Sequence, residues 1–267
     1  SRRTSLIMVA YKHKGRFCNM AEIKYEVVQR VAVLSQRPRG WERQLNLISW
    51  NDGEPKYDIR DWSPDGTRMG KGISLSHRAE FLDIWQQHVT RPGSEKLLDW
   101  LDKKTDFFTA PASTRFHGAC EGGLCMHSLN VYHALHDSFF TEGESEESYA
   151  ICALLHDLCK ANYYKLGTRN VKNEATGQWE KAPFYSVDDL FPYGHGEKSV
   201  FLIERFMKLK VEEAVAIRWH MGGFDDAARG GCFAISEAYD KYPLAVKLHI
   251  ADLQATYLME HRTSNMR

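Results

Sequence analysis

The spacing of apolar residues divides the chain into a strand-rich first part and a helical remainder. Four stretches rich in β-branched and aromatic residues are predicted as strands, over residues 25–34, 41–50, 56–62 and 70–75. Between the second and third, Asn51-Asp52-Gly53 predicts a tight hairpin, because Asp-Gly tolerates the positive φ of such turns. A helix from about His77 to His88 follows, with Ser76 as its N-cap.

Arg91-Pro92-Gly93-Ser94 breaks this pattern and is the expected domain boundary. Beyond it, helices are predicted from Leu97 and over residues 125–140, 147–161, 197–208, 211–220 and 242–260. Residues 162–186 interrupt the helices with a predicted β-hairpin. The expected fold class is therefore α+β with two domains. A four-stranded antiparallel sheet with one helix occupies 20–92, an all-α domain with a small hairpin insertion occupies 93–267, and 1–19 is an extension of uncertain order.

Composition narrows the setting of the protein. The hydrophobic content of 43% is enough for real cores, and no apolar run approaches the roughly 18 residues of a membrane span. The first residues lack a signal-peptide pattern, and six scattered cysteines do not form a disulfide framework. These observations predict a reduced, cytoplasmic protein with no membrane partner.

The net charge of zero conceals an asymmetry between the two parts. Residues 1–92 hold 16 Lys/Arg against 10 Asp/Glu, whereas residues 93–267 hold 19 against 25. A basic module beside an acidic one indicates different partners, with a polyanion for the first; unequal solvated surfaces are the alternative.

Aromatic and basic residues alternate within the predicted strands, which suits single-stranded nucleic acid. Basic groups follow the phosphates while aromatic rings stack on bases. The alternative is that most of these aromatic residues belong to the core. The candidates for nucleic-acid contact are Trp41, Arg43, Lys56, Tyr57, Arg60, Trp62 and Lys71.

A family resemblance covers about residues 22–90. The segments that carry it are Leu45-Asn46-Leu47-Ile48-Ser49-Trp50-Asn51, Pro55-Lys56-Tyr57-Asp58-Ile59-Arg60, Trp62-Ser63-Pro64 and Met69-Gly70-Lys71-Gly72-Ile73. They closely resemble bacterial members of the positive-cofactor-four-like family of single-stranded-DNA-binding coactivators. The resemblance implies a curved sheet, a helix packed on it, single-stranded nucleic acid as partner, and a homodimer formed through this domain.

The second part contains an ordered set of histidines and aspartates. An apolar run, Ala153-Leu154-Leu155, delivers the adjacent pair His156-Asp157, which predicts a mixed nitrogen and oxygen metal site on a buried helix. A second pair, His136-Asp137, is followed by Ser138 and a Glu-rich loop and is interpreted as a helix end. The first pair differs because further candidate ligands surround it in the order H…HD…H…H…D: His127, His195, His220 and Asp252.

That order resembles the HD superfamily of metal-dependent phosphohydrolases. The resemblance implies core ligands at His127, His156, Asp157 and Asp252, and further ligands at His195 and His220, with Asp157 bridging if two ions bind. Such His-rich ligation suits one or two ions of Mn, Fe, Zn, Co or Ni better than Mg. Pro111-Ala112, His117 and the Gly-Gly-Leu-x-x-His that contains His127 also resemble HD proteins related to 3′–5′ exoribonucleases.

The expected chemistry is phosphoryl hydrolysis by metal-activated water at Asp157. Lys160, three residues beyond it, is a candidate contact for a phosphate oxygen, or else an exposed helix-end lysine. His117 is a candidate proton donor to the leaving oxygen, or only a substrate contact.

Three functions are compatible with these sequence features. The first is a phosphodiesterase or nuclease acting on single-stranded nucleic acid. The second is a small-nucleotide phosphohydrolase, such as a nucleotidase, a dNTPase or a cyclic-nucleotide hydrolase, whose first domain serves dimerisation or targeting. The third is a nucleic-acid-binding regulator whose HD site senses a nucleotide without turnover.

Overall fold

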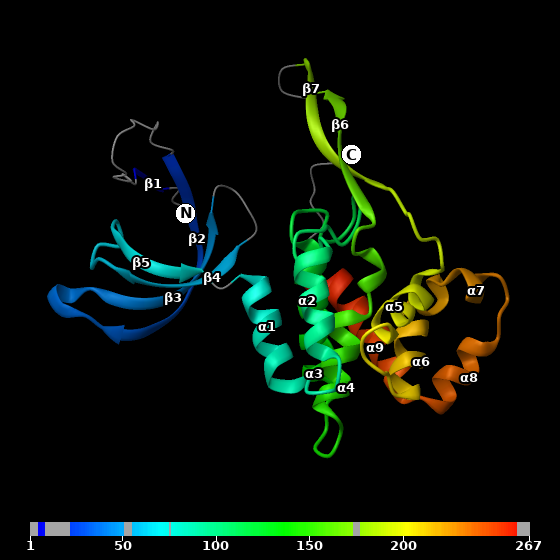
Figure 1. The fold of residues 1–267 in the computed structure, drawn as a ribbon. Helices are drawn as coiled ribbons and strands as arrows, with labels where there is room; N and C mark the ends of the chain where they lie inside the picture. Colours follow the sequence, from blue (N-terminus) through cyan, green and yellow to red (C-terminus); the bar gives the residue numbers. More distant parts are fainter. Residues whose placement is uncertain (1–4, 9–21, 51–54, 75, 173–176, 261–267) are drawn as a thin grey trace. The chain divides into compact units, whose positions relative to one another are not determined.

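The computed structural model describes residues 5–8, 22–50, 55–74, 76–172 and 177–260. The chain forms two compact units, Ser1–Ala79 and Glu80–Arg267 (Figure 1). The first is built on an antiparallel sheet, and the second is mostly helical with one β-hairpin. The predicted α+β class with two domains is therefore confirmed.

The first unit is an antiparallel sheet whose strands lie in chain order: β1 (Ser5–Met8), β2 (Glu22–Gln36), β3 (Glu42–Trp50), β4 (Lys56–Trp62) and β5 (Met69–Ser74). The last four match the predicted strands, and the short β1 adds a fifth that pairs with the first residues of β2. Register shifts interrupt the pairing of β2 with β3 at three places. Such bulges bend and twist a strand, which gives the sheet a curvature. The predicted Asn51–Gly53 turn lies outside the described residues.

The core of the sheet is small and contains polar side chains. Tyr25, Ile48 and Trp62 form its apolar centre, with the Tyr25 ring 5.8 Å from that of Trp62. Gln44 and Asn46 are buried beside them, and their amides lie 3.1 Å apart. The Asn46 amide also lies 3.0 Å from the indole nitrogen of Trp62. Buried polar groups in this unit are thus largely bonded to one another, as stability requires.

Helix α1 (His77–His88) matches the prediction, and the Ser76 hydroxyl accepts a hydrogen bond from the Ala79 N–H (3.2 Å). Its buried residues Phe81, Ile84 and Trp85 belong to the core of the helical unit. The division between the units accordingly lies at Ala79/Glu80, not at the expected 92/93.

The predicted boundary segment is itself tied into the helical unit. The Arg91 guanidinium donates to Glu213 (2.5 Å) and to Glu147 (3.0 Å). These two ion pairs hold the segment between α1 and α2 against α4 and α6. The segment predicted as a domain boundary is therefore a packed turn of the helical unit.

The second unit consists of helices around one apolar core, in the order α2 (Ser94–Lys104), α3 (Gly123–Phe139), α4 (Glu146–Leu155), α5 (His195–Glu204), α6 (Val211–Trp219), α7 (Asp226–Arg229), α8 (Ala234–Lys241) and α9 (Pro243–Gln254). Helix α3 packs against α4 and α9, and α6 packs against α5 and α9. A π-helical turn, Ala255–Met259, continues α9. The hairpin of β6 (Tyr164–Lys172) and β7 (Trp179–Val187) projects from the helices (Figure 1). No helix within the described ranges is long and apolar enough to cross a bilayer.

Helix α4 is the buried centre of this unit. It starts at the N-cap Ser145, whose hydroxyl accepts from the Ser148 N–H (3.2 Å), and every residue from Ser148 to Leu155 is buried. The helix ends at Leu155, earlier than the predicted Ala161. The prediction that His156 and Asp157 lie within a helix is therefore wrong. They lie in the turn that leads to a short 3-10 segment, Leu158–Lys160.

Candidate metal centre

The six predicted ligands come from distant segments of the second unit and meet in one cluster. They are His127 of α3, His156 and Asp157 after α4, His195 at the start of α5, His220 at the end of α6, and Asp252 of α9. Groups of three donor atoms drawn from these side chains lie within 4.8 Å of one another. Such a concentration of ionisable groups in a protein interior is costly unless the groups are paired or hold an ion.

Backbone carbonyls orient two of the histidines. The Nδ1 atom of His156 lies 2.8 Å from the carbonyl oxygen of Ala153, and that of His220 lies 2.7 Å from the oxygen of Ile217. In each case the Nδ1–H donates to a residue one turn earlier, at the end of a helix. The hydrogen bond selects the tautomer whose Nε2 lone pair is free, and both Nε2 atoms point toward Asp157.

A carboxylate orients His127. Its Nδ1 donates to Oε1 of Glu260 (2.8 Å), which also accepts from the Asn130 amide (3.0 Å). Its Nε2 lies 3.2 Å from Oδ1 of Asp252 and 3.3 Å from Nε2 of His156. Glu260 was not among the predicted site residues. A carboxylate behind a ligating histidine is the usual second layer of a metal site, because it fixes the ring and makes it more basic.

Asp157 is the common neighbour of the four histidines. Its Oδ1 lies 2.7 Å from Nε2 of His195 and 3.5 Å from Nε2 of His220. Its Oδ2 lies 3.5 Å from Nε2 of His156 and 3.6 Å from Nε2 of His127. The two oxygens thus face two different pairs of histidines, which is the arrangement of a carboxylate that can bridge two cations.

Neighbouring charges strongly shift the pKa values of the side chains in the cluster. Burial opposes charge on His127 and His195, but Asp252 and Glu260 beside the first, and Cys159 and Asp157 beside the second, raise the pKa of each to about 10. Burial would raise the pKa of Asp157, yet Lys160 and the histidines hold it well below its usual range. Protons on the histidines compensate the carboxylates here, and a divalent cation would supply the same compensation.

The donor set fits a transition metal. Imidazole nitrogens outnumber carboxylates, the tautomers of two histidines are fixed by backbone carbonyls, and buried Nε2 of His220 has no hydrogen-bond partner among the described residues. These side chains could therefore hold a metal ion. By contrast, Asp137 of the other His-Asp pair has 78% of its side chain exposed, and His136 pairs with Glu146 at 3.3 Å.

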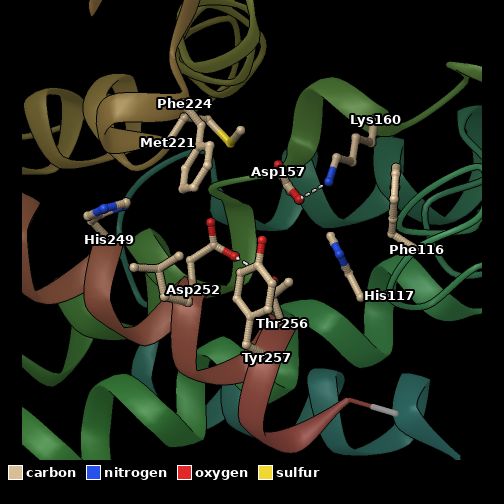
Figure 2. A pocket seen from close by; sticks show the side chains of 11 residues that line it. Phe116, His117, Asp157, Lys160, Met221, Phe224, His249, Asp252, Thr256 and Tyr257 are labelled. Atoms are coloured by element: carbon tan, nitrogen blue, oxygen red, sulfur yellow. Dashed lines mark hydrogen bonds and ion pairs between the residues drawn. The ribbon is translucent and has the colours of Figure 1, made fainter. Parts of the chain in front are cut away.

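A cavity of about 370 Å³ opens onto the cluster (Figure 2). Asp157 and Asp252 line it between Lys160 and His117 on one side and Phe224 on the other. The Lys160 ammonium donates to Oδ2 of Asp157 (2.5 Å), so the lysine faces the cluster instead of being an exposed helix-end residue. Burial first, and the charge of His127 second, lower the pKa of His117 to about 4.

The candidates for nucleic-acid contact have different surroundings in the sheet. Trp62 is 2% exposed and belongs to the core, so it is not available for base stacking, contrary to the expectation. The half-buried Arg60 pairs with buried Asp58 and covers the Trp50 ring at 4.5 Å. Arg43 is partly exposed and pairs with Asp61 (2.9 Å).

The remaining candidates are more accessible. Tyr57 is 49% exposed. Trp41 is half-buried with the Arg68 guanidinium 5.7 Å from its ring, and Lys56 is half-buried. The side chain of Lys71 lies outside the described residues. The sheet therefore offers Trp41, Arg43, Lys56 and Tyr57 to a ligand.

Residues 37–79 match the model of the family described as Transcriptional Coactivator p15 (PC4). The positive-cofactor-four-like domain expected from the sequence is thus confirmed over this range. A protein of Treponema pallidum (strain Nichols), described as uncharacterized, is 48% identical to the chain over 63 residues, which is 24% of this chain and 73% of that protein. This chain belongs to the same family as the treponemal protein. It joins a nucleic-acid-binding domain of the PC4 type to a helical unit with potential metal ligands.

Proposed function

We propose that this protein is a metal-dependent phosphohydrolase of the HD type that cleaves phosphodiesters in single-stranded nucleic acid. The observation that carries the proposal is the convergence of the histidines and carboxylates of the H…HD…H…H…D series around Asp157. One or two ions of Mn, Fe, Zn, Co or Ni bound there would lower the pKa of an attacking water and draw charge from the phosphoryl oxygens.

Lys160 would bind the phosphate. Burial opposes the charge of its ammonium group, but the carboxylate of Asp157 raises its pKa, so the lysine stays charged at neutral pH. The ammonium lies at the wall of the cavity, 2.5 Å from an oxygen of Asp157. A non-bridging phosphate oxygen placed between the cations and this ammonium would gain a charge-assisted hydrogen bond.

His117 would contact the substrate without charge. Its lowered pKa, about 4, leaves the imidazole neutral at pH 7, which makes it a weak proton donor. Its Nε2 is buried with no hydrogen-bond partner among the described residues. A neutral ring with an unused nitrogen at the cavity wall is suited to a hydrogen bond with a sugar or phosphate oxygen.

The sheet unit would bind the single-stranded nucleic acid and would also pair with a second copy of the chain. Exposed Tyr57 offers a stacking ring, and Arg43 and Lys56 offer positive charge. In the described residues β1 covers only Glu22–Tyr25 of β2, and the rest of that edge carries the exposed residues Val28, Val31, Val33 and Leu34. An open apolar edge is suited to pairing with an identical strand, which supports a homodimer formed through this unit.

A second candidate is hydrolysis of a small nucleotide. The cavity of about 370 Å³ is within the range of small-ligand sites, and Phe224, Tyr257 and Phe116 provide apolar walls for a base. In this case the sheet would serve only dimerisation or targeting.

An assay of the full chain with added Mn²⁺ or Co²⁺ separates these candidates. Labelled single-stranded DNA and RNA are compared with a panel of nucleotides, with Asp157→Ala as the blank. The proposal expects strand cleavage that Asp157→Ala abolishes. Cleavage of nucleotides alone would favour the second candidate, and binding without any turnover would support a sensor and overturn both.

A further inference from the structure

The proposed metal centre has a face on which a sulfur atom lies beside the histidines. We propose that Cys159 is a thiolate ligand of the cation held by Oδ1 of Asp157, His195 and His220, and that it makes this position selective for a soft ion such as Zn²⁺ or Co²⁺. The inference rests on the metal dependence proposed above, and assigns a ligand that the H…HD…H…H…D series does not include.

The sulfur atom already lies at ligand spacing from the His195 nitrogens. The Sγ atom of Cys159 is 3.4 Å from Nδ1 and 3.7 Å from Nε2 of His195, whose Nε2 is 2.7 Å from Oδ1 of Asp157. All three donor atoms lie within 4.8 Å of one another. Tetrahedral zinc with bonds of about 2.0 Å to nitrogen and 2.3 Å to sulfur places such atoms roughly 3.5 Å apart.

A second observation points to a cation at the same place. Nε2 of His220 is fully buried, has no hydrogen-bond partner in the described part of the chain, and lies 3.5 Å from Oδ1 of Asp157. The His220 and His195 rings are 5.1 Å apart. An unsatisfied buried nitrogen is unfavourable, and a cation between the two rings would satisfy it.

The fold holds the thiol in position. Cys159 is 3% exposed, and its backbone N–H donates to the hydroxyl of Ser199 (3.0 Å) of α5, the helix that also carries His195. Metal binding would break the S–H bond, form a sulfur–metal bond and release the proton to water. Cys159, His195 and Lys160 also line a cavity of about 550 Å³, which would let an ion reach this position from solvent.

Among the residues that the structure describes, no sulfur donor is grouped with the ligands of the other position. There Nε2 of His127 lies near Oδ1 of Asp252, Nε2 of His156 and Oδ2 of Asp157, all nitrogen or oxygen donors. Thiolate ligands select softer ions than carboxylates do. The two positions would therefore differ in metal preference, with the thiolate position holding Zn²⁺ or Co²⁺ more tightly.

Cobalt titration of the metal-free full chain tests the inference. The wild-type protein is expected to bind two Co²⁺ and to show a sulfur-to-cobalt charge-transfer band in the near ultraviolet. In Cys159→Ser the band should be lost. One Co²⁺ should bind about 10- to 100-fold more weakly, while the affinity for the other Co²⁺ should not change. Cys232→Ser removes an exposed thiol and should retain the band.

The cobalt titration separates a wrong role for Cys159 from the absence of a metal centre. Cobalt binding with no thiolate band, or a band that Cys159→Ser retains, would overturn the role of Cys159 and leave the metal centre standing. No cobalt binding at all would overturn both. If Cys159→Ser does not fold, zinc K-edge absorption of the wild-type protein decides, because it must show a sulfur neighbour at about 2.3 Å; a shell of nitrogen and oxygen alone contradicts the proposal.

Discussion

Both units bury polar side chains, but they use them differently. In the sheet, Asn46 and Gln44 lie 3.1 Å apart and Asn46 reaches the Trp62 indole, so their polar groups serve one another. In the helical unit, His156 and His220 each use one nitrogen on a backbone carbonyl and direct the other at a shared centre. The amides of the sheet satisfy one another inside a core, whereas the histidines of the helical unit leave nitrogen atoms available for a ligand. Convergent donors with an unused atom indicate a ligand; mutually bonded ones indicate structure.

Replacing Asp157 with alanine should cause the largest loss of metal content and hydrolysis at the site in the helical unit. Both of its oxygens face histidines, so its loss removes ligands from both cation positions, and hydrolysis and metal content should fall more than about 100-fold, above the range for residues that only orient ligands. Elemental analysis and turnover measure this. The matched control is Asp137→Ala in the other His-Asp pair, which should behave as the wild type; equal losses in both variants would contradict the site.

The stability of the metal-free protein should depend on pH through the cluster of buried histidines and carboxylates in the helical unit. Burial opposes charge on His127 and His195, but the neighbouring carboxylates and Cys159 raise the pKa of each ring to about 10, against 6.5 for free imidazole. The stability from these protonated rings is fully present below about pH 6.5 and is lost as the pH rises toward 10. With chelator present, Tm should therefore fall by several degrees between pH 7 and 9. Metal affinity should rise over the same interval, because the cation displaces these protons. A Tm that is flat or rising would contradict the assigned contacts.

Glu260 tests whether orientation matters at the site. Glu260→Ala leaves Nδ1 of His127 without its acceptor, so metal affinity should fall about 10- to 100-fold. Glu260→Gln keeps an acceptor oxygen and should recover part of the loss. The exposed Glu237→Gln is the control, and calorimetric metal titration is the measurement. Unchanged affinity in Glu260→Ala would remove Glu260 from the site.

Replacing Tyr57 tests whether the sheet binds nucleic acid, and we expect only a small loss of affinity. Tyr57→Ala should weaken binding of single-stranded DNA about fivefold to tenfold, near the lower end of the 1–3 kcal/mol of one stacked base. Hydrolysis of a small nucleotide should not change. Fluorescence anisotropy with a labelled oligonucleotide measures the first. Full-strength binding by Tyr57→Ala would show that this residue does not contact the strand.

The sequence predicted most of the elements because their apolar periodicity is strong. The four longer strands, the hairpin, and α1 to α6 were expected from such patterns, whereas α8 was not, because Ala234–Lys241 buries only Ala238. The end of α4 was also missed. Leu158 and Cys159 continue the apolar run beyond Leu155, and only tertiary contacts reveal that the run includes a turn.

The candidate ligands could be proposed from order and residue type, but their surroundings could not. Glu260 reaches His127 because the π-helical turn after α9 returns the chain toward α3, a contact over 133 positions that leaves no local pattern. Trp62 has the residue type of a stacking platform, and only its burial excludes it. Chemistry can be suggested by residue types, whereas exposure and partners depend on the packing.

The number of transition-metal ions bound per chain decides whether the metal centre around Asp157 exists. The full chain and Asp157→Ala are purified without chelator and analysed for transition metals per chain. The wild-type protein is expected to contain one or two divalent ions and the variant essentially none. A wild-type protein without metal after supplementation with Mn, Fe, Co, Ni or Zn, or a variant that retains the full complement, would contradict it.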